Sequence, residues 1–300
     1  MPEIGFLCSG SKAEFAHLLA AFRDGLKMTG YKPVGSAPKG PKEVRVHVEW
    51  ADGDYAKLPD KAKALIDKRV QVVAATGGIG AARAAQDYAA KAGSQASVLS
   101  MSGRERSKPG EHGANAKVLH LATTKEKAED HNRYRRLRDL LGHNAKICHL
   151  INKHTRVHDD EENWGDVISA SNVGELKTAF ETAVKQNKAD AILVSGDPFF
   201  NRRRADIIRL ADKYKVPVCY PFREYVEAGG LMSQGPNLAN SYRRLGIWVG
   251  MVLGGTKAKD LPDTDAGHRE LVINLKAARK LGIPLASLGE LLLMADAVIQ

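Results

Sequence analysis

Two apolar runs, each followed by a polar turn, constrain the fold of this 300-residue chain more than any other feature. Ala191–Phe200 reads as a short buried strand that ends in a Ser-Gly-Asp-Pro turn, and Val216–Ser233 reads as strand, turn, short helix and strand. Strands that alternate with helices predict βαβ units and a parallel sheet. Ligands of such sheets bind beyond the carboxyl ends of the strands, so Asp197 and the Phe222–Glu224 turn are predicted to share one rim.

The same alternation starts at the N-terminus and begins again after Gly142. Two successive sheets imply two Rossmann-like α/β lobes with parallel sheets, and the run Lys117–Ala122 is a candidate strand crossing between them. Residues 31–43, rich in Pro, Gly and Lys, are predicted to be a loop. Strands are predicted at residues 4–9, 44–50, 70–76, 98–101, 146–152, 191–195 and 216–220, and helices at residues 13–29, 55–68, 80–92, 173–186 and 203–214.

Composition narrows the class of protein. A hydrophobic content of 43% is enough for folded cores, and three cysteines in separate apolar runs are typical of buried free thiols. The net charge is +10, but acidic residues are interleaved with the basic ones, so nucleic-acid binding is not predicted. The sharpest basic cluster, Arg133–Arg138, is predicted to form the solvated face of a helix, with Leu137, Leu140 and Leu141 facing inward.

The apolar segments of the sequence indicate the cellular compartment in which the protein is expected. It has no run of about 18 apolar residues that could span a membrane. Its first residues have neither the basic region nor the apolar stretch of a secretory signal. We therefore expect a cytoplasmic chain, or a periplasmic one if a leader has been removed.

Three strand ends in the first lobe offer polar groups to a ligand. Gly77 and Gly78 end a strand and open a helix, where backbone N–H groups and the helix dipole suit a carboxylate or phosphate. Ser9 and Ser11 follow the first strand, and Ser102 follows the fourth, so their hydroxyl groups could reach the same rim. The plainer interpretations stay open: the glycines could form a tight turn without a ligand, and Ser11 could be a helix N-cap.

The second lobe offers acidic and aromatic candidates. A buried Asp197 could pair with a ligand ammonium, or it could cap the helix that follows. Glu224 could contact a ligand or form a surface pair with Arg223. Tyr220 and Phe222 could form an aromatic wall of a ligand site, or they could pack in the core.

Catalytic and cofactor motifs are not found in the sequence. Arg83 stands where a dinucleotide fingerprint needs a third small residue, and there is no Walker loop, nucleophile elbow or CxxC pair. His154 and His158 are the one histidine pair at a spacing of four, but they lie in a predicted loop, so a metal site is not predicted. We expect no cofactor, no metal and no enzymatic activity.

Two blocks of sequence resemble a known family. The first runs from Ile4 to Gly78 and includes Phe22-Arg-Asp-Gly-Leu and Glu49-Trp-Ala-Asp-Gly; the second runs from Ala189 to Lys276 and includes Arg223-Glu-Tyr-Val-Glu-Ala-Gly-Gly-Leu-Met-Ser. These blocks are similar to the solute-binding components of bacterial ABC importers, among the type I periplasmic binding proteins that include tryptophan/tyrosine-binding members. The chain departs from the family pattern in the segments 102–116 and 153–165.

The resemblance implies a two-lobed Venus flytrap architecture with a ligand cleft and a closing hinge. Lobe 1 would comprise residues 1–117 and 235–260, and lobe 2 residues 118–234 and 261–300. Partners would be a small amino acid or aromatic acid and an ABC permease, and the chain would meet a membrane only through that permease. An alternative of the same fold is a cytoplasmic ligand-sensing regulatory module. Family positions that contact ligand correspond here to Ser9, Ser11, Thr76, Gly77, Gly78, Asn152, Asp197 and Glu224.

Overall fold

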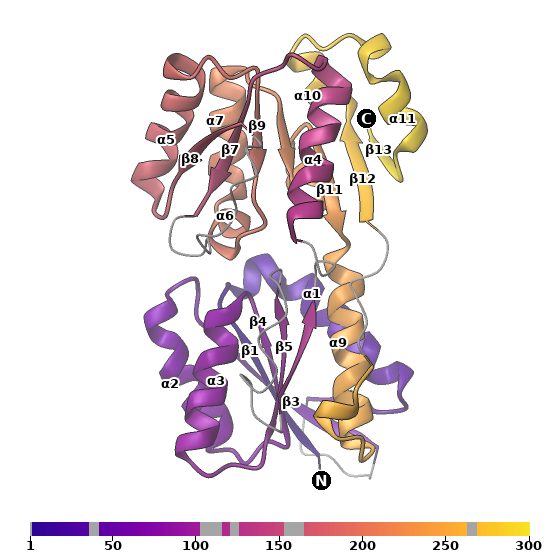
Figure 1. The fold of residues 1–300 in the computed structure, drawn as a ribbon. Coiled ribbons are helices and arrows are strands. Elements are labelled where there is room, and N and C mark those ends of the chain that lie inside the picture. The colour runs from indigo at the N-terminus through magenta and orange to yellow at the C-terminus, as the bar shows by residue number, and fades with distance from the viewer. Residues whose placement is uncertain (1, 36–41, 103–115, 121–125, 153–164, 263–268) are drawn as a thin grey trace. The chain divides into compact units, whose positions relative to one another are not determined.

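The computed structural model describes residues 2–35, 42–102, 116–120, 126–152, 165–262 and 269–300. The chain divides into two compact units, each built around its own sheet (Figure 1). Unit 1 comprises Met1–Thr124 and Leu238–Gly267, and unit 2 comprises Lys125–Asn237 and His268–Gln300. These boundaries lie three to seven residues after those expected from the sequence.

The described strands of unit 1 form a six-stranded parallel sheet in the order β2-β3-β1-β4-β5-β6. Two expectations are corrected here. The predicted loop at residues 31–43 contains β2, which pairs with β3, and the run expected to cross between lobes supplies β6, which pairs with β5. The strands are β1 (Glu3–Cys8), β2 (Lys32–Val34), β3 (Glu43–Trp50), β4 (Val72–Thr76), β5 (Ser97–Ser102) and β6 (Ala116–His120).

Helices cover both faces of this sheet, with α2 and α3 on one face and α1 and α9 on the other (Figure 1). Helices α1 and α9 approach closely because glycines face each other's backbone: a Cβ at Gly25 would overlap the carbonyl oxygen of Arg243, and one at Gly246 would overlap that of Phe22. The helical elements are α1 (Lys12–Met28), η1 (Tyr55–Lys57), α2 (Leu58–Ile66), α3 (Ile79–Lys91), α9 (Leu238–Leu253) and η3 (Ala258–Asp260).

The described strands of unit 2 form a seven-stranded sheet in the order β13-β12-β11-β10-β9-β7-β8. All neighbours are parallel except β11 and β12, which are antiparallel. The chain leaves unit 2 after β11 and returns at β12, and this order along the chain makes the two strands antiparallel. The strands are β7 (Ile147–Ile151), β8 (Asp166–Ser169), β9 (Ala191–Val194), β10 (Val218–Tyr220), β11 (Met232–Pro236), β12 (Arg269–Asn274) and β13 (Ala297–Ile299).

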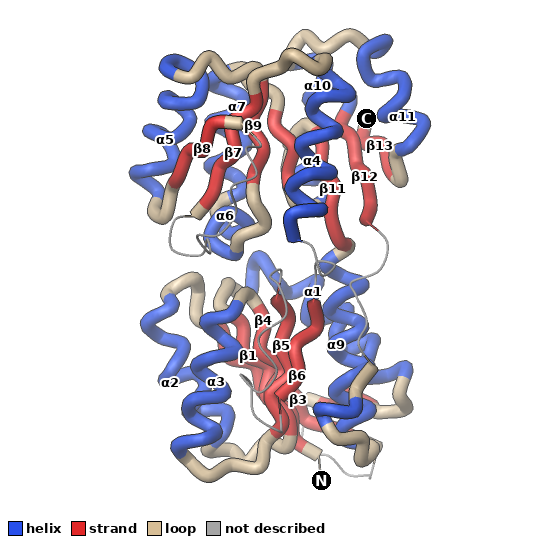
Figure 2. Tube along the Cα trace, viewed as in Figure 1, coloured by secondary structure: helices blue, strands red, loops and turns tan. Residues whose placement is uncertain are grey.

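Helices cover both faces of this sheet (Figure 2). A hydrophobic core lies on each face. One packs α5 and α7 against Leu150, Ile192 and Val218; the other packs α4, α10 and α11 against Ile147 and Leu193. The alternation of side chains along each strand gives the two faces. The helical elements are α4 (Glu126–Leu141), α5 (Val173–Glu181), η2 (Thr182–Gln186), α6 (Pro198–Arg202), α7 (Arg204–Tyr214), α8 (Arg223–Glu227), α10 (Leu275–Lys280), η4 (Leu285–Leu288) and α11 (Gly289–Met294).

The predicted fold class is confirmed: both units are α/β, with mostly parallel sheets between layers of helices. The strands predicted from periodicity occur within a few residues of their expected bounds. Among the described helices, none combines the length and the apolar character needed to cross a bilayer.

Candidate functional site

The carboxyl ends of β1 and β4 bring three of the predicted residues together in unit 1. Cys8 pairs with Thr76 in the parallel register, and the amide of Ser9 donates to the Thr76 carbonyl at 3.2 Å. The Ser9 hydroxyl donates to the Gly77 carbonyl oxygen at 2.5 Å, and Ser9 is 4% exposed. The turn between β4 and α3 is therefore fixed to the end of the central strand.

The start of α3 needs glycine at this turn. Gly77 and Gly78 have φ values of +79° and +106°, a region that residues with a Cβ rarely occupy. A Cβ at Gly77 would also overlap the Ser9 hydroxyl. Gly78 is the N-cap of α3, a helix of 13 residues whose first amides have no partner within the helix. These N–H groups and the helix dipole suit an anionic group such as a carboxylate.

Tyr55 is a neighbour of this helix start that sequence patterns did not reveal. It begins η1 after β3 and is 41% exposed, and its ring carbon would lie 3.2 Å from a Cβ at Gly80. The turn before it is joined to the rim, because the amide of Gly53 donates to the Ser9 carbonyl at 2.6 Å. An exposed aromatic ring thus lies beside the amides at the start of α3. The Glu49–Gly53 block, which resembles the family and leads into this turn, was the available sequence signal. It lies far from Gly80 along the chain, so the sequence did not predict that Tyr55 and Gly80 are neighbours.

Two other first-lobe candidates have structural roles. Thr76 is fully buried, and its hydroxyl donates to the Leu7 carbonyl at 3.2 Å, so its side chain holds β4 to β1. Ser11 is the N-cap of α1, and its amide and hydroxyl both bond to the Glu14 carboxylate, the hydroxyl at 2.7 Å. Ser102 ends β5, but its side chain lies outside the described part of the chain.

One cysteine borders the unit 1 rim. Cys8 is buried, and burial raises the pKa of its thiol to about 11, an effect that the hydrogen bond between Cys8 and Thr76 partly offsets. At neutral pH this thiol stays protonated, which makes it a poor nucleophile.

In unit 2, the ends of β7 and β9 place Asn152 and Asp197 side by side. The Asn152 side-chain amide donates to Asp197 Oδ1 at 3.2 Å, and both residues are at least nine-tenths buried. The same oxygen accepts from the Phe199 amide at 2.8 Å, because Asp197 is the N-cap of α6. The capping role that the sequence left open is therefore present.

The turn after β10 has one side facing the core and one facing the rim. Tyr220 is 1% exposed and its ring stacks on Tyr225 at 4.8 Å, so the expectation that it contacts a ligand is corrected: it is a core residue. Burial raises the pKa of both phenols well above the usual value.

Phe222 is half-buried, and its ring would lie 3.8 Å from a Cβ at Gly196, one residue before Asp197. Glu224 is half-buried in the first turn of α8.

A buried ionic network behind this rim was missed by sequence reasoning. Arg133 of α4 is 3% exposed, pairs with Asp130 and donates to the Gln234 carbonyl at 3.1 Å, so the prediction that it lies on a solvated face is wrong. His149 Nε2 lies 3.4 Å from Asp130 Oδ2 and 2.7 Å from Ser195 Oγ. Burial opposes ionisation of Asp130, but the Arg133 charge and His149 outweigh it and hold the pKa of Asp130 well below its usual range.

The Ser195–His149–Asp130 group does not have the geometry of a catalytic triad. In a triad the serine and the carboxylate bond to opposite ring nitrogens. Here both oxygens face the same nitrogen, Nε2. Within the described residues, no cluster of three or more His, Cys, Asp or Glu is placed to hold a metal ion, while His154 and His158 lie outside them.

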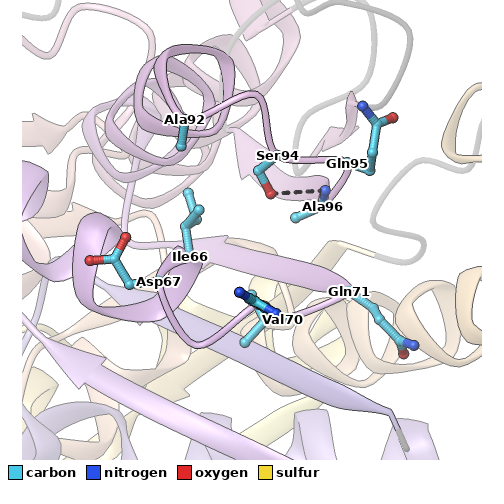
Figure 3. Close-up of a pocket in the computed structure, with 9 residues that line it drawn as sticks. Ile66, Asp67, Val70, Gln71, Ala92, Ser94, Gln95 and Ala96 are labelled. Atoms are coloured by element: carbon cyan, nitrogen blue, oxygen red, sulfur yellow. Dashed lines mark hydrogen bonds between the residues drawn. The ribbon is translucent and has the colours of Figure 1, made fainter.

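A surface cavity of about 610 Å³ in unit 1 lies away from these candidates (Figure 3). Its lining includes Gln71, which precedes β4, and Ala96, which precedes β5, so it lies at the amino ends of the strands. It contains none of the predicted ligand residues. Within its wall, Ser94 Oγ accepts from the Ala96 amide at 3.2 Å.

Comparison with known families identifies the second part of the chain. Residues 167–299 match the model of the family described as ABC transporter substrate binding protein. This segment is similar to ABC transporter substrate-binding proteins. The resemblance drawn from the sequence is thereby confirmed, and small-solute binding is the class of function that this family implies. No curated protein sequence matches the chain.

Solved structures show the fold of the whole chain. A conserved domain protein from Vibrio cholerae is 18% identical with a TM-score of 0.78, and each chain is 99% covered. An ABC domain from Streptococcus pneumonia in complex with L-Trp is 22% identical with a TM-score of 0.75, covering 99% of this chain and 100% of that one. The transcription regulator CcpA of Lactococcus lactis is 12% identical with a TM-score of 0.60, covering 90% of this chain and 97% of that one. The ABC substrate-binding family and this regulator therefore share the type I periplasmic-binding-protein fold with the chain.

Proposed function

We propose that this protein is the solute-binding component of an ABC importer and that it binds an amino acid or an aromatic acid for delivery to a permease. The observation that carries the proposal is the start of α3, where glycine-bordered amides lie between the Ser9 hydroxyl and the exposed ring of Tyr55. Amide donors at a helix start suit a carboxylate. A tyrosine ring beside them suits an apolar or aromatic ligand group. The work of such a component lies on the outer side of the cytoplasmic membrane.

The unit 2 rim favours an amino acid over a simple acid. Asp197 is a buried carboxylate at the end of β9, and a ligand ammonium would make a charge-assisted bond with it. Phe222 lies nearby, because its ring would lie 3.8 Å from a Cβ at Gly196. An acidic group and an aromatic ring on this rim suit the ammonium and side chain of an amino acid.

A thermal-shift screen of amino acids, aromatic acids and sugars tests the proposal. We expect amino acids to raise the melting temperature, because a ligand that binds only the folded state stabilises it. Stabilisation by sugars alone, or by none of the three classes, would contradict the proposed ligand class.

The Asp197→Asn variant then tests the assigned ammonium contact. Asparagine keeps an oxygen for the cap of α6 but removes the charge, so we expect about a tenfold weaker affinity for the best amino acid. Isothermal titration gives the affinity. Asp190→Asn is the matched control, since Asp190 accepts from the Lys146 amide at 2.8 Å on an exposed turn of the same unit and its replacement should leave affinity unchanged. Equal affinity in the Asp197 variant and wild type would remove Asp197 from the site.

A regulatory module of the same fold is the second candidate, favoured by the likeness to the transcription regulator CcpA. Such a module would act in the cytoplasm. Cell fractionation separates the two candidates: recovery in the periplasm or on the outer face of the membrane supports the importer role, and recovery in the cytoplasm supports the regulatory one.

A further inference from the structure

Two buried polar side chains of β12 hold the two ends of α8. Glu270 is 8% exposed, and its Oε2 accepts from Arg223 Nη1 at 2.9 Å. Four residues later, Asn274 is 6% exposed and donates from Nδ2 to the Val226 carbonyl at 3.2 Å. Strand β12 therefore fixes both the first and the last turn of this short helix.

The second carboxylate oxygen of Glu270 reaches the end of the neighbouring strand. Oε1 accepts from the Asn237 side-chain amide at 3.1 Å. Asn237 is the last residue of unit 2 before the chain passes into unit 1 at Leu238. One buried carboxylate thus joins α8 to the point at which the chain leaves the unit.

The backbone of β11 also lies directly against the turn that precedes α8. Gly235 is opposite Glu270 in the antiparallel register of β11 and β12. A Cβ at Gly235 would overlap the Pro221 carbonyl oxygen. Because there is no space for a methyl group between strand and turn, a shift of this turn toward β11 would displace the strand.

Arg223 is held on two sides within the unit. Its Nε donates to Glu227 at 2.9 Å, four residues along α8, and its Nη1 donates to Glu270. The guanidinium therefore fixes the first turn of the helix. Its sequence neighbours, Phe222 and Glu224, are both candidate ligand residues.

We infer that Glu270 is a positioning residue for the candidate ligand turn Phe222–Glu224 and couples that turn to Asn237, where the chain leaves unit 2. The inference rests on the proposed function, because it concerns a turn assigned there to the ligand. Glu270 acts through Arg223 and Asn237 and needs no contact with the ligand itself.

A double-mutant cycle on Glu270 and Arg223 tests the coupling, with the best amino acid of the screen as probe. We expect Glu270→Gln and Arg223→Gln each to raise Kd about fivefold. The double variant should also raise Kd about fivefold, because either single change already removes the ion pair between Arg223 and Glu270. The matched control is the exposed pair of Lys280 and Asp212, 2.7 Å apart in the same unit, where Lys280→Gln should leave Kd unchanged. An unchanged Kd in the Glu270 variant, or factors that multiply to about 25-fold in the double variant, would overturn the inference.

Hydrogen exchange of the ligand-free protein gives a readout that does not depend on any ligand. In Glu270→Gln we expect faster exchange both in α8 and at Asn237, and the same pattern in Arg223→Gln. Wild-type exchange rates at both places would overturn the inference. If the screen yields no ligand, the proposed function fails, and the exchange rates alone decide whether Glu270 holds the turn.

Discussion

Replacing Asp130 with Asn is expected to lower the free energy of unfolding of unit 2 by about 3 kcal/mol, because it leaves a buried cation without its counter-charge. Arg133 is 3% exposed, and its guanidinium lies between the Asp130 carboxylate and the Gln234 carbonyl oxygen. The variant also removes the charge that faces His149 Nε2 at 3.4 Å. Hydrogen exchange of the β7 and β9 amides measures the effect within unit 2.

The matched control for this change is Asp139→Asn on the same helix. Asp139 pairs with Arg136 at 3.0 Å, but their side chains are 31% and 21% exposed, so the loss should stay below about 1 kcal/mol. Equal losses in the two variants would show that the burial of Arg133 does not increase the contribution of its ion pair to the free energy of unfolding.

The effect of Asp130→Asn should also depend on pH. The pKa of Asp130 is held below its usual range in the folded state, so its contribution to stability is complete above the unfolded pKa of about 3.9. The contribution is lost as the pH falls through the folded pKa. The difference between wild type and variant should therefore be constant from neutral pH down to about pH 5 and shrink below about pH 4. A difference that grows in acid would contradict this origin of the stability.

The sequence predicted most of the strands because each is a short apolar run with a turn at its end. It also placed Leu137 and Leu140 on the inner face of α4, and both are buried. Arg133 lies four residues before Leu137 and so shares that inner stripe, but its charge favoured a solvent-exposed interpretation. The error came from treating residue type as stronger evidence than position, because no pattern in the sequence showed that Asp130 would neutralise the arginine.

The candidate site was predictable to the level of strand ends and no further. Residues 9, 77, 152 and 197 follow strands and meet at two rims, as parallel sheets require. Side-chain direction was not predictable at Thr76 and Tyr220, where the last residue of a strand faces inward. The contact of Tyr55 with Gly80 depends on the packing of two separate turns, which periodicity does not encode.

Gly77→Ala is expected to weaken binding of the best amino acid about 100-fold, a loss of about 2.7 kcal/mol. A left-handed backbone costs a residue with a Cβ about 1–2 kcal/mol, and Gly77 has a φ of +79°. The added methyl group would also overlap the Ser9 hydroxyl, which donates to Gly77 itself. The turn must therefore shift, and the amides at the start of α3 shift with it. Isothermal titration measures the affinity, and a thermal melt measures the accompanying loss of stability.

Gly93→Ala is the control for Gly77→Ala, because it adds backbone strain without displacing the start of α3. Gly93 lies just after the other end of α3, with a φ of +60° and no atom within 4 Å of an added Cβ. Its replacement carries the strain without the overlap, so the melting temperature should fall while Kd stays at the wild-type value. If both variants lose stability and neither loses affinity, the amides at the start of α3 do not bind the ligand. A loss of affinity confined to Gly77→Ala would follow from displacement of the helix start, because strain alone is common to both positions.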